Sequence, residues 1–277
     1  MEIKKYLIET KEISAEIIPA LGGRIESLIY KPTSKNWVWK NNKIKSTKVL
    51  KGSNYDENWQ GGWEELFPND AIEDFSWGKG YDHGELWSAS WKIKELDENK
   101  LSMEAKNLTS GTEFIKTISV SQSRINVKYT GRINFEDYFL FKLHLAVPVG
   151  SRLSFKLKNY EITPVDKNFG NILESNNHHK FFNLERDTGL YDFGYLNYPT
   201  NKVTIEDENK NKLKLNYDMH NLKYLWIFQS QGGWMGHNVA VIEPCTNGRK
   251  SLKAAISENM SIKGPINFET NYSVELS

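Results

Sequence analysis

A glutamate, Glu243, directly follows an apolar segment of the chain, where a carboxylate is unusual. Residues 238–242 are apolar and rich in β-branched side chains, as in a strand, and they lead directly into Glu243 and Pro244. Because proline cannot donate to a strand ladder, we expect the strand to end there. Burying a carboxylate costs free energy unless it is paired or used. Two interpretations stay open: Glu243 serves a functional site, or it is a strand-end glutamate that faces water or pairs with a lysine.

A histidine lies inside a second apolar run, at residues 138–148. With a pKa near its ordinary value, His144 is able to act as an acid around neutral pH. The alternative is a core histidine whose ring is satisfied by a backbone carbonyl. Lys142 lies two residues earlier, so both side chains point to one face of a strand. Lys142 therefore either reaches the same cleft or protects the edge of a sheet.

Two polar segments combine turn residues with side chains that are able to bind a ligand. In residues 82–87, His83 lies between Asp82 and Gly84, so it is either a ligand or an ordinary turn residue. Asp218 follows a predicted strand and precedes a His-Asn pair, and the same two interpretations apply to it.

Aromatic residues make up 13% of the chain, including 9 tryptophans. Tryptophan stacks well on the apolar face of a sugar, and it also fills cores. Trp87 and Trp234, together with Trp63 and Trp226, are therefore candidates for stacking, with core packing as the alternative for each.

Charge and cysteine content limit the classes of function. The 277 residues carry a formal net charge of +1, which gives no support to nucleic-acid binding or to an anionic membrane surface. No apolar run approaches the roughly 20 residues of a membrane helix. The single cysteine, Cys245, excludes an intrachain disulfide and favours a reducing compartment such as the cytoplasm. No ligand spacing indicates a metal site.

Most of the chain alternates between apolar and polar residues, as half-buried strands do. Hairpins are predicted at residues 88–105 and 202–217. Two alternating segments, 112–120 and 124–133, are separated by a short polar break, and further strands are predicted at 6–8, 13–18, 24–30, 154–162 and 261–276. Two segments, 40–62 and 166–200, lack clear periodicity, which indicates functional loops in a compact domain. The sequence therefore predicts one all-β domain over residues 1–277, with antiparallel strands in two packed sheets or a large β-sandwich.

Five segments resemble motifs of the aldose 1-epimerase (galactose mutarotase-like) family. They are residues 19–28 (PALGGRIESL), 61–68 (GGWEELFP), 82–87 (DHGELW), 143–148 (LHLAVP) and 242–244 (IEP). The segments follow the order of the family's motifs and span nearly the whole chain.

The resemblance implies the large antiparallel β-sandwich of that family and an enzyme that interconverts sugar anomers without a metal or organic cofactor. A base takes the proton of the C1 hydroxyl while an acid protonates the ring oxygen, so that the ring opens and then closes on the other face. By resemblance, Glu243 is the base, His144 is the acid, and His83 hydrogen-bonds the sugar or its ring oxygen.

The chain departs from the family in two places. Well-known members carry a sugar-contacting arginine before the His-Gly motif, whereas residues 61–70 offer Glu64, Glu65, Asn69 and Asp70. Among these residues, Asn69 is a candidate sugar ligand. The His-Pro-Tyr-Phe pattern around the family's catalytic histidine is also absent.

The predicted partner is a neutral, unphosphorylated sugar. Phosphate recognition normally needs a bidentate arginine, a lysine cluster or a helix N-terminus, and the candidate segments are acidic. Lys142 is the one basic residue that the sequence places near the site, and Arg24 is expected to pair with a carboxylate. The alternative function is a carbohydrate-binding protein without turnover. Retention of both Glu243 and His144 favours the enzyme, because a binder does not need an acid opposite a base.

Overall fold

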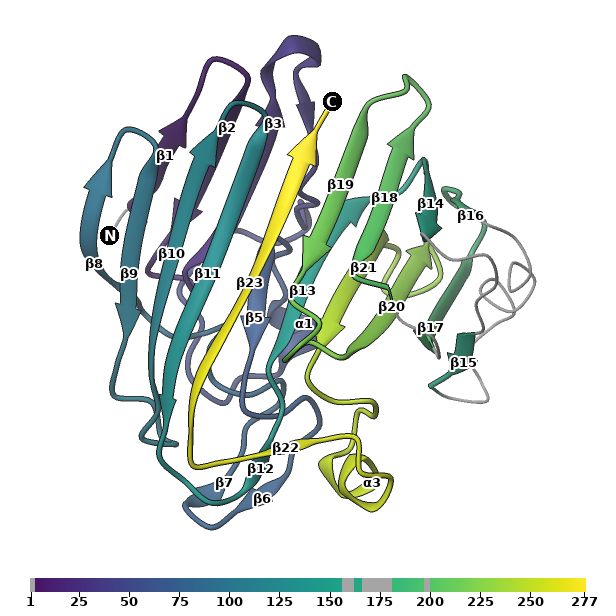
Figure 1. Ribbon diagram of the computed structural model, residues 1–277. Coiled ribbons are helices and arrows are strands. Elements are labelled where there is room, and N and C mark those ends of the chain that lie inside the picture. The colour runs from purple at the N-terminus through teal and green to yellow at the C-terminus, as the bar shows by residue number, and fades with distance from the viewer. Residues whose placement is uncertain (1–2, 156–161, 166–180, 197–199) are drawn as a thin grey trace.

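Two large sheets face each other across an apolar core in the computed structural model (Figure 1). The structure describes residues 3–155, 162–165, 181–196 and 200–277. The strands of these residues pair antiparallel, apart from two isolated parallel bridges. The predicted all-β antiparallel sandwich is confirmed.

The first sheet, within the described part of the chain, has ten strands, and it combines the N-terminal strands with strands from the middle and the later part of the sequence. In spatial order it consists of β1 (Tyr6–Glu9), β2 (Ile13–Ile18), β3 (Arg24–Tyr30), β5 (Trp63–Leu66), β13 (Lys142–Pro148), β21 (Asn238–Cys245), β20 (Tyr224–Gln231), β17 (Leu190–Leu196) and β15 (Ile162–Pro164), and β4 (Lys35–Asn36) pairs with β3. Strands that are far apart in sequence, β5, β13 and β21, therefore lie side by side at its centre (Figure 1).

The second sheet has nine strands among the described residues. Its order is β16 (Phe181–Leu184), β14 (Ser151–Phe155), β18 (Lys202–Asp207), β19 (Lys212–Tyr217), β23 (Ile266–Leu276), β11 (Arg124–Ile133), β10 (Glu113–Ser121), β9 (Lys100–Ala105) and β8 (Lys92–Asp97). Smaller elements are the pairs β6 (Asp74–Phe75) with β7 (Gly78–Lys79) and β12 (Tyr138–Phe139) with β22 (Ile262–Lys263), the helices α1 (Tyr55–Asn58) and α3 (Leu252–Ser257), and a 3-10 turn (Lys31–Thr33). No helix in the described residues is long and apolar enough to cross a membrane.

The two sheets differ in how their faces are covered. On β10 and β11 buried and exposed residues alternate, so the second sheet has one core face and one solvent face. On β13, by contrast, nearly every residue is buried. Leu143, Leu145 and Val147 belong to the core between the sheets, and the alternation of a strand points Lys142 and His144 to the opposite, outer face. Loops therefore cover polar side chains on the outer face of the first sheet.

The two predicted hairpins are confirmed as β8–β9 and β18–β19. The alternating segments 112–120 and 124–133 form β10 and β11, which pair with each other. The prediction of a loop over 166–200 is wrong for β16 and β17. The later part of β17 is buried on both faces, so its sequence lacks the alternation of a half-buried strand. Residues 166–180 and 197–199 of that segment lie outside the described residues. The predicted strand at 154–162 corresponds to the end of β14 and the start of β15, and residues 156–161 lie outside the described residues.

A buried ion pair joins the two sheets. Glu65 of β5 and Lys116 of β10 both point into the core, where the Lys116 ammonium lies 2.8 Å from Oε1 and 2.9 Å from Oε2 of Glu65. Both side chains are fully buried. Tyr129 also donates to Oε1 of Glu65, and Lys116 donates to the carbonyl of Gly23 at 3.0 Å. The charges are thus satisfied from several elements, as buried charges must be.

Replacing Lys116 by methionine is expected to lower the free energy of unfolding by about 3–5 kcal/mol, because Glu65 is left charged and unpaired in the core. Changing Glu65 to glutamine in the same protein should restore part of that loss, because the uncompensated charge is removed. Urea denaturation of the single and double variants measures both values. A double variant that is less stable than Lys116→Met would contradict the role of the pair.

Candidate active site

The central strands of the first sheet place a histidine between two glutamates. The strand registers pair Glu64 on β5 with His144 on β13, and Glu243 on β21 with Trp226 on β20. The register between β13 and β21 places Glu243 opposite His144. Glu64, His144 and Glu243 therefore form a row across three neighbouring strands. Side chains directly opposite each other on antiparallel strands have Cβ atoms within about 5.5 Å. The sheet alone therefore brings the three groups together.

Glu243 lies inside the sheet rather than at its end. The prediction that the strand stops before Pro244 is wrong, because β21 continues to Cys245 and Pro244 pairs with Leu225 of β20. A proline this close to a strand end removes only one donor, and the neighbouring pairs hold the chain in place. Glu243 is consequently 1% exposed and does not face water.

A cleft of about 160 Å³ lies over this row of side chains. Its lining is Tyr55, Asp56, Trp59, Asp70, His83, Lys142, His144, Phe193, Phe228, Trp234, Glu243 and Lys250. Five of these were predicted as site residues from the sequence: His83, Lys142, His144, Trp234 and Glu243. The described residues contain no group of three or more His, Cys, Asp and Glu side chains that could hold a metal ion.

Lys142 lies on the cleft floor between two carboxylates. Its Nζ is 2.6 Å from Oε2 of Glu243 and forms an ion pair with Oδ2 of Asp70. Burial opposes the charge on Lys142, but Asp70 and Glu243 outweigh it and raise the pKa of Lys142 above its ordinary value. Burial also opposes the charge on Asp70, yet Lys142, with His83 and Lys250, lowers the pKa of Asp70. Lys142 is therefore a charged residue of the cleft, and the pairing of Glu243 with a lysine is confirmed.

The pKa values of Glu243 and His144 move in opposite directions. Burial raises the pKa of Glu243, although Lys142 opposes this shift. Burial, reinforced by the charges of Lys142 and His83, lowers the pKa of His144 well below its ordinary value. The expectation of an ordinary histidine pKa is therefore wrong, because the imidazolium is disfavoured in this surrounding. Nε2 of His144 is 3.9 Å from Oε1 of Glu243, too far for a direct hydrogen bond, so each is available to a third group in the cleft.

The other ring nitrogen of His144 meets a tyrosine. Nδ1 lies 3.3 Å from Oη of Tyr55, which donates to Oε1 of Glu64 at 2.6 Å. Burial raises the pKa of Glu64 to about 7, even though the hydrogen bond from Tyr55 opposes this shift. Burial and the nearby Glu64 raise the pKa of Tyr55 well above its ordinary value, so the phenol keeps its proton. Among the described residues, side chains and not a backbone carbonyl are thus the partners of the His144 ring nitrogens.

A tight turn holds His83 at the cleft. His83 has φ +56° and Gly84 has φ +75°, and a Cβ on Gly84 would clash with the carbonyl of Phe67. The His83 N–H donates to the carbonyl of Asp70 at 2.8 Å, and its Nδ1 is 2.8 Å from Oδ1 of Asp82. The His83 ring stacks on Tyr55, with centroids 3.9 Å apart and planes at 12°. His83 is therefore both a turn residue and a residue of the cleft.

Aromatic rings form the remaining wall. Trp59 lies 5.8 Å from Trp234 and 5.3 Å from the ring of His144, measured between centroids. Trp234 also meets Phe228 edge to face at 5.4 Å. Such a wall suits the apolar face of a sugar ring.

Three predicted sugar ligands do not line the cleft. Trp87 packs edge-on against Tyr55 with centroids 4.9 Å apart, and thus supports the cleft from behind. Asn69 is fully buried, and its amide donates to two backbone carbonyls within the loop after β5. Asp218 lies in the turn after β19 of the second sheet, where its Oδ1 accepts from a backbone N–H two residues later. Asn69 and Asp218 thus bind backbone groups of loops and turns, which use the same side-chain types as sugar ligands.

Sequence reasoning did not single out Tyr55, Trp59, Asp70 and Lys250. Tyr55 and Trp59 belong to the segment 40–62, for which the lack of periodicity predicted a functional loop. The sequence therefore indicated this region but not these two residues. Lys250 lies at the cleft, with Nζ 3.8 Å from Oδ1 of Asp70. The expectation that Lys142 is the one basic residue near the site is therefore wrong.

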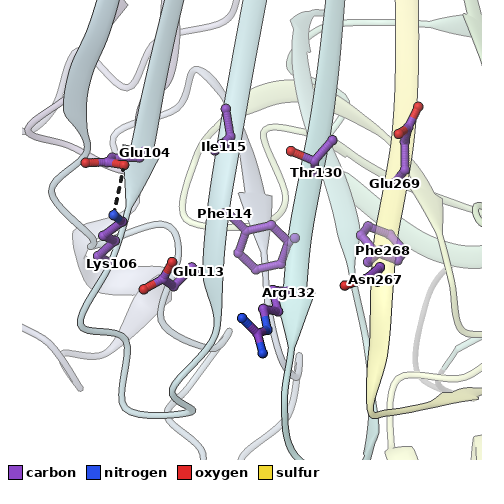
Figure 2. Close-up of a pocket in the computed structure, with 11 residues that line it drawn as sticks. Glu104, Lys106, Glu113, Phe114, Ile115, Thr130, Arg132, Asn267, Phe268 and Glu269 are labelled. Carbon is purple, nitrogen blue, oxygen red and sulfur yellow. Dashed lines mark ion pairs between the residues drawn. The ribbon is translucent and has the colours of Figure 1, made fainter.

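A second hollow lies on the second sheet, over β9, β10, β11 and β23 (Figure 2). Two of its charged residues, Glu104 and Lys106, form an ion pair at 3.2 Å, and Ile115 is 44% exposed. No histidine lines it. Because this hollow offers an open strand surface without an acid–base pair, the cleft of the first sheet is the candidate site.

Replacing Lys142 by methionine is expected to destabilise the fold by about 3–5 kcal/mol near neutral pH, because two buried carboxylates lose their shared partner. Lys142 holds the pKa of Asp70 below its ordinary 3.8. A lowered carboxyl pKa stabilises the folded state above the unfolded pKa, and this stabilisation is lost as the pH falls through the folded pKa. The difference between the wild type and the variant should therefore shrink below about pH 4. Urea denaturation of both proteins, near neutral pH and below about pH 4, measures the difference in unfolding free energy. A difference that does not change with pH would contradict the ion pairs.

The comparisons with known proteins agree on the fold. No family model and no curated protein sequence matches the chain. Among solved structures, a galactose mutarotase related enzyme from Lactobacillus acidophilus has a TM-score of 0.72 at 14% identity, over 99% of this chain and 97% of that one. A galactose mutarotase-like protein from Clostridium acetobutylicum gives 0.69 at 16% identity, over 100% and 95%. A candidate aldose 1-epimerase from Escherichia coli K12 gives 0.74 at 11% identity, over 99% of both chains. The chain has the galactose mutarotase-like sandwich fold over nearly its whole length.

Proposed function

We propose that the chain is an aldose 1-epimerase-like enzyme that interconverts the anomers of a sugar. The observation that carries this proposal is the buried pair of Glu243 and His144, placed side by side on the floor of a cleft with an aromatic wall. The names of the structural neighbours support it at the level of the fold. The volume of the cleft suits one small molecule rather than a polymer.

In this reaction Glu243 takes the proton of the C1 hydroxyl while Nε2 of His144 gives a proton to the ring oxygen. The bond between C1 and the ring oxygen breaks, the C1 carbonyl rotates, and the ring closes on the other face with the two groups in exchanged roles. Burial raises the pKa of Glu243, which makes it a better base for a hydroxyl proton than an ordinary carboxylate.

The remaining residues of the cleft orient the sugar and the base. Lys142 holds the Glu243 carboxylate by an ion pair, so the base does not reorganise when it gains a proton. His83 presents its ring to the cleft from a fixed turn and hydrogen-bonds a sugar hydroxyl in this proposal. Trp59 and Trp234 stack on the sugar.

The substrate in this proposal is a neutral sugar without a phosphate. Three carboxylates line the cleft, Asp56, Asp70 and Glu243, and Lys142 is already shared by two of them. Arg24, a possible phosphate ligand, is bound instead to Glu26 at 2.7 Å, which confirms the expected pairing with a carboxylate. A phosphate would therefore meet more negative than free positive charge.

We further propose that residues 1–277 act as a single domain and that the protein works in the cytoplasm. The core between the sheets takes residues from both the first and the last strands, and Cys245 is a buried free thiol.

Changing Glu243 to glutamine is expected to slow anomer interconversion by about 10²-fold or more, because glutamine keeps the shape of the side chain but cannot take the proton. Polarimetry or NMR of freshly dissolved α-anomers, over a panel of neutral sugars, measures the rate. Glu206→Gln on β18 of the second sheet is the matched control and should keep the full rate. A fully active Glu243→Gln protein, or sugar binding by the wild type without any acceleration, would identify a carbohydrate-binding protein instead.

Neutral hexoses are expected to bind more tightly than their 6-phosphates, and pentoses more tightly than their 5-phosphates, because the carboxylates of the cleft repel the phosphate. Competition against a neutral substrate at low and high salt measures the preference. Lys250→Ala tests the exposed cation at the cleft and should leave the affinity for neutral sugars nearly unchanged. Tighter binding of a 6-phosphate that weakens with salt and with Lys250→Ala would overturn the assignment.

A further inference from the structure

His144 needs a source of protons if it acts as the acid. It is a neutral imidazole in this surrounding, and a neutral imidazole that loses its Nε2 proton becomes an anion unless Nδ1 gains a proton at the same time. Nδ1 faces Tyr55 at 3.3 Å, and Tyr55 faces Glu64 at 2.6 Å. The three buried side chains form one continuous path from β5 through α1 to β13.

The hydroxyl of Tyr55 has a single proton to donate. The directions of its hydrogen bonds with Glu64 and with His144 therefore depend on each other. When Glu64 is ionised, Tyr55 donates to it, and Nδ1 of His144 must carry a hydrogen to donate to Tyr55. When Glu64 is protonated, it donates to Tyr55, Tyr55 donates to Nδ1, and the hydrogen of His144 is on Nε2, toward Glu243. The ionisation of Glu64 thus selects the tautomer of His144.

We propose that Glu64 supplies, through Tyr55 and His144, the proton that reaches the ring oxygen of the sugar. This inference rests on the proposed function and deepens it. Glu64 and Tyr55 are positioning residues in this scheme, because they set the tautomer of His144 and restore its Nδ1 proton, whereas His144 itself touches the ring oxygen.

Every proton in the step has a donor and an acceptor. Glu243 takes the proton of the C1 hydroxyl, the bond between C1 and the ring oxygen breaks with its electron pair going to that oxygen, and the oxygen takes the Nε2 proton of His144. Nδ1 then takes the proton of Tyr55, and Tyr55 takes that of Glu64. The step begins with Glu64 protonated and Glu243 ionised and ends with the reverse. Ring closure on the other face returns each proton, and His144 stays neutral throughout.

The surroundings of both glutamates favour their protonated forms. Both are almost fully buried, and burial raises the pKa of each. Asp70, which Lys142 and other cations hold ionised, takes no part. The titratable and charged groups near the relay come from every element packed against it. They are Arg24 on β3, Asp56 on α1, Glu65 on β5, Asp70, Asp82 and His83 between β5 and β8, Lys142 on β13 and Glu243 on β21.

The test is the tautomer of His144, read directly by nitrogen-15 NMR of the histidine-labelled full chain. The His144 signals are assigned by their loss in His144→Asn, which serves for assignment alone. In the wild type we expect the hydrogen to shift from Nε2 to Nδ1 as the pH rises through about 7, where Glu64 ionises. This shift should disappear in Glu64→Gln, which does not titrate, and in Tyr55→Phe, which cuts the path.

Tyr224→Phe is the matched control, since Tyr224 on β20 is a partly exposed tyrosine that does not line the cleft. It should show the wild-type shift. If His144 keeps one tautomer at every pH in the folded wild type, or if Tyr55→Phe shows the same shift as the wild type, the relay is wrong.

Kinetics separate the relay from the proposed function. We expect Tyr55→Phe and Glu64→Gln to lower kcat by about 10²-fold with little change in KM, and Glu64→Gln to lose the fall in rate above about pH 7. Variants with unchanged kcat and the alkaline limb intact would overturn the relay while leaving the enzyme assignment in place. A wild type that shows the tautomer shift but no turnover of any sugar would instead remove the proposed function and keep the coupling of Glu64 to His144.

Discussion

The buried ion pair between Glu65 and Lys116 is the constraint on which the arrangement of the site depends. Glu65 must point into the core to meet the ammonium that the second sheet provides. Because successive side chains of a strand point to opposite faces, Glu64 must then point to the outer face, beside His144. If the register of β5 shifted by one residue, Lys116 would lose its partner, and Glu65 instead of Glu64 would point toward the cleft. Two adjacent glutamates therefore differ in role because one contact between the sheets fixes the strand.

Lys142 is paired with two carboxylates of the cleft whose pKa values shift in opposite directions. Its ammonium is paired with Asp70 and with Glu243, but the pKa of Asp70 is lowered whereas that of Glu243 is raised by burial. Asp70 also has His83 and Lys250 near it, which adds to the stabilisation of its charged form. One carboxylate is thus a fixed charge that holds Lys142 in place, and the other is able to exchange a proton.

Much of the fold was predictable from the sequence, because the second sheet has one solvent face and its hairpins alternate clearly. Most of β21 and the later part of β17 in the first sheet are buried on both faces, so alternation did not reveal β17 or the full extent of β21. In the site, His144 and Glu243 were found by their unusual place within apolar runs. Tyr55 was not, since nothing local in its segment shows that the chain folds back over β13. The pKa of His144 was missed for the same reason: it depends on burial and on charges brought from other strands and loops.

The loops over the first sheet also explain why His83 belongs to the site whether or not it touches a sugar. The N–H of Tyr55 donates to Oδ2 of Asp82 at 2.9 Å, while the ring of the neighbouring His83 stacks on the tyrosine. His83 keeps a left-handed backbone conformation that most side chains avoid, and the contacts of the surrounding turn hold it there. Tyr55 is therefore fixed at its backbone, its ring and its hydroxyl before any ligand arrives. A hydroxyl held in this way can pass a proton between Glu64 and His144 without first being reoriented, which is the kind of preorganisation that an acid–base site requires.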